Sequence, residues 1–180
     1  MNIRKLYFVL TLTVVILVSG IGNMYVQRKG EHGWVFHIFT QKMSAKSNQH
    51  NVAGHVDFDY TFVEDTDSVS MLSTVKFPIG TKPVSIDIVS AGKSYNFSPE
   101  IIYVKPKGKM SLEYRFKISF PFSIWNEIYE SPLPFSLQYN TILQETEHTA
   151  SFGYDKSKWG ANQKKMLAII EIIKYNTNKL

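Results

Sequence analysis

The sequence contains no cysteine, and this absence removes several structural and chemical options at once. A disulfide framework, a thiolate zinc site, a cysteine nucleophile and a lipid-modified N-terminal cysteine are all excluded. Without disulfides the domain must be held together by its hydrophobic core, whereas small secreted animal domains are usually dense in disulfides. The 180 residues are enough to build such a core.

Recognisable catalytic motifs are missing as well. The chain has no Gly-x-Ser-x-Gly nucleophile elbow, no phosphate-cradling glycine loop and no His-Glu-x-x-His zinc motif. It also has no internal repeat and no low-complexity tract. We therefore predict that the protein is not an enzyme, and we assign no catalytic, cofactor-binding or metal-binding residues from the sequence.

Positive charge is present but is not gathered into one stripe. The formal net charge is +5, and leaving out Arg4 and Lys5 of the N-terminal segment leaves 18 basic against 15 acidic residues, or +3. Lysines cluster within residues 105–109 and 156–165, with acidic residues between the two clusters. Nucleic-acid binding needs a coherent basic surface and usually a recognisable module. The sequence therefore predicts no nucleic-acid partner and solvated lysines.

The chain begins with a long apolar run. Arg4 and Lys5 precede residues 6–27, a stretch of 22 residues without formal charge. A short positive region, an apolar run and small residues are typical of an export signal. Residues 6–26 are also long enough to span a bilayer as a helix. We predict a retained signal anchor or a cleaved signal peptide within residues 1–29, and a buried core helix is the remaining alternative.

An anchor and a cleaved signal lead to the same side of the membrane. With an anchor, the protein is a single-pass envelope protein whose domain lies outside the cytoplasm; with cleavage, it is periplasmic or secreted. We divide the remainder into a juxtamembrane segment and linker over residues 30–54 and a folded domain over residues 55–180.

Strand patterns dominate this remainder. Aromatic residues make up 14% of the chain, and they favour half-buried strand surfaces. The clearest alternation runs over residues 56–62 and 112–120, where every second residue is large and apolar. Residues 33–40 are either a strand or an aromatic juxtamembrane segment. Further strands are predicted over residues 69–77, 84–88, 95–97, 100–104, 135–139 and 149–154.

Two segments have helical spacing. Residues 123–130 suit a helix of one or two turns, and apolar residues over 157–175 recur at helical intervals, although the isoleucines there also suit a final strand. About seven short strands separated by Gly and Pro turns favour two packed sheets. We predict a mainly β fold, a β-sandwich that is immunoglobulin-like or related, with an N-terminal hydrophobic helix and a C-terminal helix.

Few polar residues are spaced as metal ligands. His50 and His55 together with Asp57 or Asp59 have ligand types that suit zinc. The same residues are also what an ordinary solvated strand face contains, and this is the interpretation we favour.

A cluster of acidic residues raises the question of calcium. Glu64, Asp65 and Asp67 lie close together, but the glycine and the closing glutamate of the 12-residue calcium loop are missing. The sequence therefore favours a polar hairpin turn at this position.

Three functional hypotheses remain. The first is a non-enzymatic extracytoplasmic module that binds another protein, with Trp125, Tyr129 and Trp159 either as interface anchors or as core residues. The second is a small-ligand or carbohydrate-binding domain, with residues such as Asp59 and Arg115 lining a groove. The third is an extracytoplasmic hydrolase, which would need a polar pocket with a perturbed carboxylate or histidine.

Overall fold

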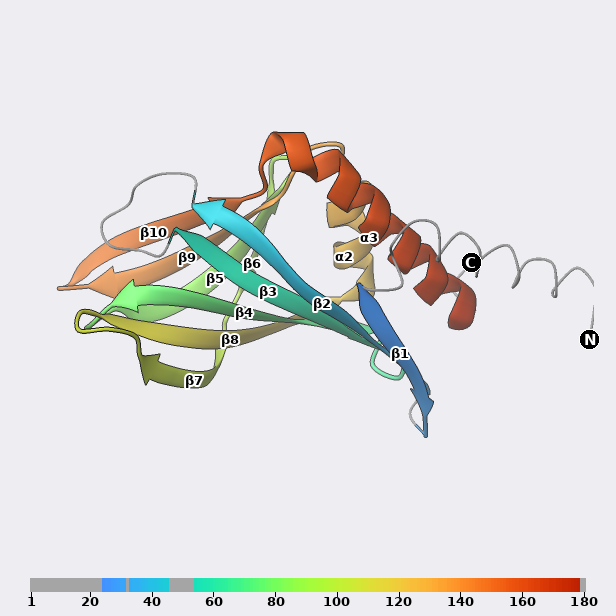
Figure 1. Cartoon of the computed structure of the whole chain (residues 1–180), viewed down its shortest axis with the longest axis horizontal. Helices are drawn as coiled ribbons and strands as arrows, with labels where there is room; N and C mark the ends of the chain where they lie inside the picture. Colours follow the sequence, from blue (N-terminus) through green and yellow to red (C-terminus); the bar gives the residue numbers. More distant parts are fainter. Residues whose placement is uncertain (1–23, 32, 46–53, 179–180) are drawn as a thin grey trace, which may run out of the picture.

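The computed structural model describes residues 24–31, 33–45 and 54–178. Ten strands and two helices follow one another in this part of the chain (Figure 1). Their bounds are β1 Tyr25–Gly30, β2 Gly33–Ala45, β3 His55–Val63, β4 Ser68–Pro78, β5 Lys82–Ser90, β6 Lys93–Phe97, β7 Glu100–Pro106, β8 Ser111–Pro121, α2 Phe122–Glu130, β9 Ser136–Leu143, β10 Thr146–Gly153 and α3 Lys156–Asn176.

All ten strands belong to one open antiparallel sheet. The order is β6-β5-β9-β10-β2-β3-β4-β8-β7, and β1 pairs with β2 outside this path. The prediction of a mainly β fold is confirmed. A sandwich of two separate sheets is not confirmed, because β10 joins β2 through Phe152 opposite Ala45 and Gly153 opposite Ser44. The described residues also form ten strands, where the sequence predicts about seven.

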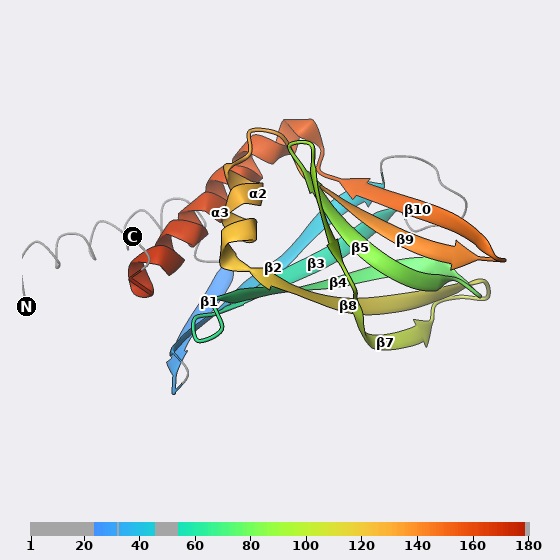
Figure 2. The same cartoon turned by 180° about the vertical axis from the view of Figure 1, so that it is seen from behind.

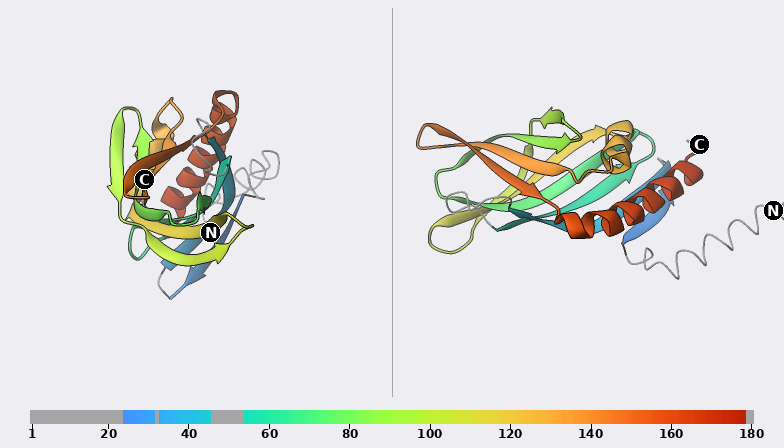
Figure 3. Two further views of the ribbon diagram at one scale, coloured as in Figure 1. Left: turned by 90° about the vertical axis from the view of Figure 1, so that its left-hand side faces the viewer. Right: turned by 90° about the horizontal axis from the view of Figure 1, so that it is seen from above.

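The sheet curls so that strands far apart in its order face each other across one core (Figure 3). The ring centroid of Tyr139 in β9 lies 6.0 Å from that of Phe77 in β4 and 5.9 Å from that of Phe116 in β8. At the end of the path, Phe97 of β6 lies 5.5 Å from Phe120 of β8. A single curled sheet therefore covers the core from opposite sides, as two separate sheets do in a sandwich.

The predicted inward faces are buried. In β3, Phe58 and Phe62 have no exposed surface, and the polar residues between them are half-buried on the other face. Phe116 is equally buried in β8. Successive side chains of a strand point to opposite faces, so alternation in the sequence becomes an apolar interior and a polar exterior.

Both predicted helices are present and pack together at one end of the sheet (Figure 2). The first N–H of α2, on Phe122, donates to the carbonyl of Asp67 in the turn between β3 and β4, at 3.1 Å. In α3 the Asp155 carboxylate accepts from the N–H of Ser157 at 2.9 Å, which caps the helix. The helical interpretation of the C-terminal segment is therefore confirmed, and the final strand is not formed.

The chain before β3 contributes two strands to the same sheet. Residues 33–40 are strand, as one of the two interpretations predicted, and β2 continues to Ala45 into the segment predicted as a linker. β1 is not predicted, and it includes Tyr25 and Val26 at the end of the apolar run. Residues 1–23 of the predicted N-terminal segment lie outside the described part, whereas its last residues, from Tyr25 onward, are in β1 and not in a helix. Within the described part, no helix combines the length and the apolar character needed to cross a membrane.

Candidate functional site

The proposed metal ligands do not converge in the described residues. His55 and Asp57 form a loose pair, with Nε2 and Oδ2 3.6 Å apart, and both side chains are exposed. Asp59 instead accepts a hydrogen bond from Arg115 Nη2 at 2.8 Å. His50 lies outside the described residues. Within the described ranges, no group of three or more histidine, aspartate or glutamate side chains is placed to hold a metal ion.

Arg115 also connects neighbouring strands on the outer face. Its Nη1 donates to Thr74 Oγ1 at 3.0 Å, while Nη2 bonds Asp59. Thr74 of β4 lies opposite Arg115 of β8. Asp59 of β3 lies opposite Leu72, two residues along β4 from Thr74. A guanidinium held in this way stabilises cross-strand pairing, and the contacts give no support to the ligand-binding groove predicted around it.

The acidic cluster at the turn between β3 and β4 has structural partners. Glu64 Oε2 accepts the N–H of Trp34 at 2.7 Å, which links this turn to the start of β2. Asp67 has φ +47°, and its N–H donates to the carbonyl of Glu64. The polar-turn interpretation fits these contacts.

Trp125, Tyr129 and Trp159 lie in the core, so their interpretation as exposed interface anchors is wrong. The rings of Tyr129 and Trp159 stack 5.7 Å apart where α2 meets α3. Trp125 also packs 5.3 Å from Tyr60 of β3. Helical spacing places an aromatic residue on a face, but only the position of the neighbouring elements decides whether that face is covered.

The same aromatic cluster contains buried hydroxyl groups. The hydroxyl oxygens of Tyr60 and Tyr129 lie 3.3 Å apart. Burial raises the pKa of both phenols well above the ordinary value of 10.0, and the nearby Tyr154 phenol raises them further. Both hydroxyls therefore stay protonated near neutral pH and serve as hydrogen-bonding groups of the core.

The two strands at the ends of the sheet path differ in how well they are covered. β6 is linked to α2 by an ion pair between Lys93 and Glu127, and Phe97 packs onto Phe120 of β8. β7 pairs only with β8 in the described part of the chain. Its other side therefore leaves backbone N–H and C=O groups without a neighbouring strand, and such an edge is a template for pairing with another chain.

Exposed apolar side chains lie on β7 and in the turns at the neighbouring end of the sheet. Ile101, Ile102 and Val104 of β7 are 45% to 48% exposed. Met110, in the turn between β7 and β8, is 80% exposed, and its carbonyl accepts the N–H of Ile79, which is 55% exposed. We call these five residues the apolar rim. Apolar groups gathered beside an unpaired edge are typical of surfaces that bind another protein.

Charged residues of the edge are organised around one buried carboxylate. Glu113 of β8 is only 8% exposed, and its Oε1 lies 2.8 Å from Lys105 Nζ. The Tyr103 hydroxyl donates to the same oxygen at 3.3 Å, and Lys107 Nζ lies 3.9 Å from Oε2. The hydrogen bond from Lys105 is the main cause that lowers the pKa of Glu113 below its ordinary value of 4.5. The carboxylate stays ionised and holds Lys105 and Lys107 along the hairpin.

Comparisons of the chain with protein-family models, with curated proteins and with solved structures return no match. The geometry of the described residues therefore carries the functional argument alone. The sequence predicted β7 as a short strand but not its place at the end of the sheet, because strand order depends on long-range pairing. Pro99 and Pro106, on either side of this strand, are a local signal from which an edge position could have been inferred.

Proposed function

We propose that the protein is a non-enzymatic extracytoplasmic module, tethered to a membrane or exported across it, that assembles with other protein chains through β7. The observation that carries this proposal is the open edge of β7 beside the apolar rim. An extended segment that pairs with such an edge gains main-chain hydrogen bonds, and its alternate side chains contact the apolar groups.

The edge is also restrained in ways that favour selective pairing. β7 has only seven residues, Pro106 ends it, and a bulge at Ile102 interrupts its register with β8. Short length, proline, lysine and bulges are the means by which natural sheets limit indiscriminate edge-to-edge aggregation. The remaining exposed surface is small, so we expect an interaction that depends on a matching partner strand.

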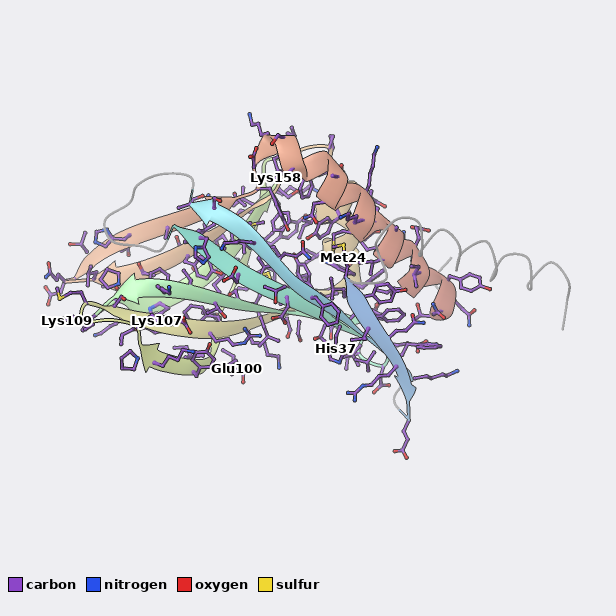
Figure 4. All side chains as sticks on the ribbon, viewed as in Figure 1. Met24, His37, Glu100, Lys107, Lys109 and Lys158 are labelled. Atoms are coloured by element: carbon purple, nitrogen blue, oxygen red, sulfur yellow. The ribbon has the colours of Figure 1, made fainter. Side chains whose placement is uncertain are left out.

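The position of the edge suits a tethered module. Figure 4 shows Lys109, in the turn after β7, at the end of the sheet that is far from Met24 and the helices. A tether that precedes Met24 would leave this turn pointing away from the membrane. The export-signal pattern of residues 1–29 supports the tether or the export, and it enters the proposal from the sequence alone.

The test is the native mass of the full-length protein recovered separately from the membrane and the soluble extracytoplasmic fractions. We expect a mass above that of one chain, and we expect Ile101→Lys with Val104→Lys to reduce it to that of a monomer. Leu133→Lys is the matched control, because Leu133 is 60% exposed but lies in the loop after α2. A wild-type protein that stays monomeric in both fractions, or that is found only in the cytoplasm, would refute the proposal.

A further inference from the structure

We infer that the chain which pairs with β7 is a second copy of this protein, joined antiparallel through β7 of each copy about a twofold axis. This inference rests on the proposed function, namely that the β7 edge binds protein, and it names the partner. Identical chains most often associate as twofold dimers in which one surface meets itself.

The sequence of β7 is complementary to itself in the antiparallel direction. It begins with Glu100 and reaches Lys105 before the final proline. If the axis passes between Ile102 and Tyr103, Glu100 lies opposite the partner's Lys105. The same register places Ile101 opposite the partner's Val104. Opposite charges and apolar pairs at facing positions are the contacts that stabilise neighbouring strands.

Because of the bulge in β7, the two residues of each facing pair point to the same face of the sheet. Glu100 and Lys105 lie opposite Lys117 and Glu113 of β8, which point outward. Residues five apart in a regular strand would point to opposite faces, because the period is two. The extra residue, Ile102, restores the match, so both charged residues face outward. A shift of the pairing by one residue would set charged positions against apolar ones and lose both contacts.

The apolar residues on the core-facing side of β7 are also complementary to themselves in this register. Ile101 lies opposite Phe116 and Val104 lies opposite Tyr114, so both point to the core side of the sheet, yet both keep almost half of their surface exposed. A facing strand with apolar residues at the same two positions would cover them. A second copy of β7 supplies such a strand.

Glu100 and Lys105 are still exposed to a neighbouring copy, although each already forms an ion pair within its own chain. Glu100 is 64% exposed and 3.6 Å from Lys117 Nζ, whereas Lys105 is 53% exposed beside Glu113. The Glu100–Lys117 pair is exposed on both sides, so its attraction is weak. Lys105 is bound to the buried Glu113, but about half of its side chain stays exposed to the neighbouring copy.

The dimer should be weak and dependent on concentration. A seven-residue strand pair is small beside the roughly 1,000 Å² or more that stable interfaces bury. Tethering both copies in one membrane would raise their effective concentration and favour pairing. We expect the full chain to pass from monomer to dimer as its concentration increases.

The experiment measures the dissociation constant of the full-length protein in detergent by analytical ultracentrifugation, for wild type, Glu100→Lys, Lys105→Glu and the double variant. Each single reversal sets like charges opposite each other, and we expect about a tenfold weaker dimer. The double variant should return to within about threefold of wild type, since only the pairing between copies is restored. Lys158→Glu, a reversal in α3, is the control and should leave the constant unchanged.

Because the chain has no cysteine, a second measurement can test the register directly. Glu100→Cys and Lys105→Cys proteins, mixed and oxidised, should give a disulfide-linked dimer that contains one of each, because facing residues lie within disulfide reach. Either protein alone should give little product, since its two cysteines would lie at opposite ends of the strand pair.

The outcomes separate the inference from the proposed function. If Ile101→Lys with Val104→Lys abolishes assembly with a different protein while the pure chain stays monomeric, the second-copy inference is wrong and the proposed function stands. A dimer that the double reversal does not restore, and in which the mixed cysteines do not link, overturns the twofold β7 pairing. If the chain assembles with nothing, both fail.

Discussion

Adjacent residues of β8 have opposite roles, and this contrast shows how the fold depends on single side chains. Phe116 is fully buried between Tyr114 and Tyr139, while Lys117 on the other face is 40% exposed. Arg115 and Glu113 share the outer face, where Arg115 bonds Thr74 of β4 and Glu113 pairs with Lys105 of β7. A substitution at Phe116 therefore alters the core, whereas a substitution at Lys117 alters only a surface contact.

Phe116→Asp is expected to unfold the domain. A carboxylate without a partner in this position costs at least several kcal/mol, which is comparable with the total stability of a typical domain. Lys117→Gln, one residue away, should change the free energy of unfolding by no more than about 0.5 kcal/mol. Urea denaturation followed by circular dichroism measures both, and equal destabilisation by the two variants would contradict the assignment of faces.

Glu113→Gln is expected to change how stability depends on pH. The pKa of Glu113 is lowered in the folded state from 4.5, mainly by the hydrogen bond from Lys105. Its contribution is therefore complete above pH 4.5 and is lost as the pH falls below that value towards the folded-state pKa. The free energy of unfolding of the variant should fall less steeply with acidification over this range. An unchanged acid slope would show that the carboxylate adds nothing to stability.

The C-terminal end of α2 depends on a polar group supplied by α3. Gln163 of α3 donates through Nε2 to the carbonyl oxygens of Tyr129 at 2.9 Å and Ser131 at 2.7 Å. These carbonyls lie at the C-terminal end of α2, where the backbone has no helical partner. One side chain thus completes the end of one helix and joins it to the other.

Gln163→Ala is expected to destabilise the protein by about 1–3 kcal/mol, because two carbonyls at the helix contact lose their donor. Lys164→Ala, at the exposed neighbouring position of the same helix, is the control for the change in helix propensity. Thermal unfolding of the two variants under the same conditions makes the comparison. Equal melting temperatures would mean that solvent replaces the Gln163 amide at no cost.

The turn between β1 and β2 requires glycine at one of its two glycine positions. Gly33 has φ +81°, and a Cβ there would lie 2.5 Å from Glu64 Oε2, the atom that accepts the Trp34 N–H. Gly33→Ala should lower the free energy of unfolding by about 1–3 kcal/mol. Gly30→Ala meets no atom within 4 Å and should have a much smaller effect. Chemical denaturation tests the pair, and equal losses would contradict the steric argument.

At the scale of the whole molecule, stability should decrease from the centre of the sheet to its ends. β3 and β4 have neighbours on both sides and core contacts on one face, whereas β6 and β7 end the path. Backbone groups at an edge open to solvent without disturbing the core. The curled sheet therefore combines a rigid interior with edge strands that open more readily.

Amide hydrogen exchange is expected to follow this gradient. Protection should be highest in β3 and β4 and lowest in β6 and β7 at low protein concentration. At high concentration, only β7 should gain protection if it pairs with another copy. Mass spectrometry of peptides from the exchanged protein gives both measurements, and uniform protection across the sheet would contradict the gradient.

Much of the local structure could be predicted because it depends on neighbouring residues alone. Alternation over residues 56–62 and 112–120 identified two strands and their inward faces, and helical spacing identified α2 and α3. The β1 strand escaped prediction because Tyr25 and Val26 continue an apolar run whose pattern suits a membrane helix. The burial of Trp125 and Tyr129 escaped it because the sequence does not say which element covers α2.

By itself, the sequence determined the β-rich composition, the positions of most strands, the two helices and the core-facing side of the most regular strands. Period-two and helical patterns are properties of the local chain, so no knowledge of distant contacts was needed. Only the tertiary structure decided that the strands form one sheet, that β7 ends it and that its apolar side chains remain exposed. Those features depend on which strands pair across long stretches of chain, and many pairings satisfy the same local pattern.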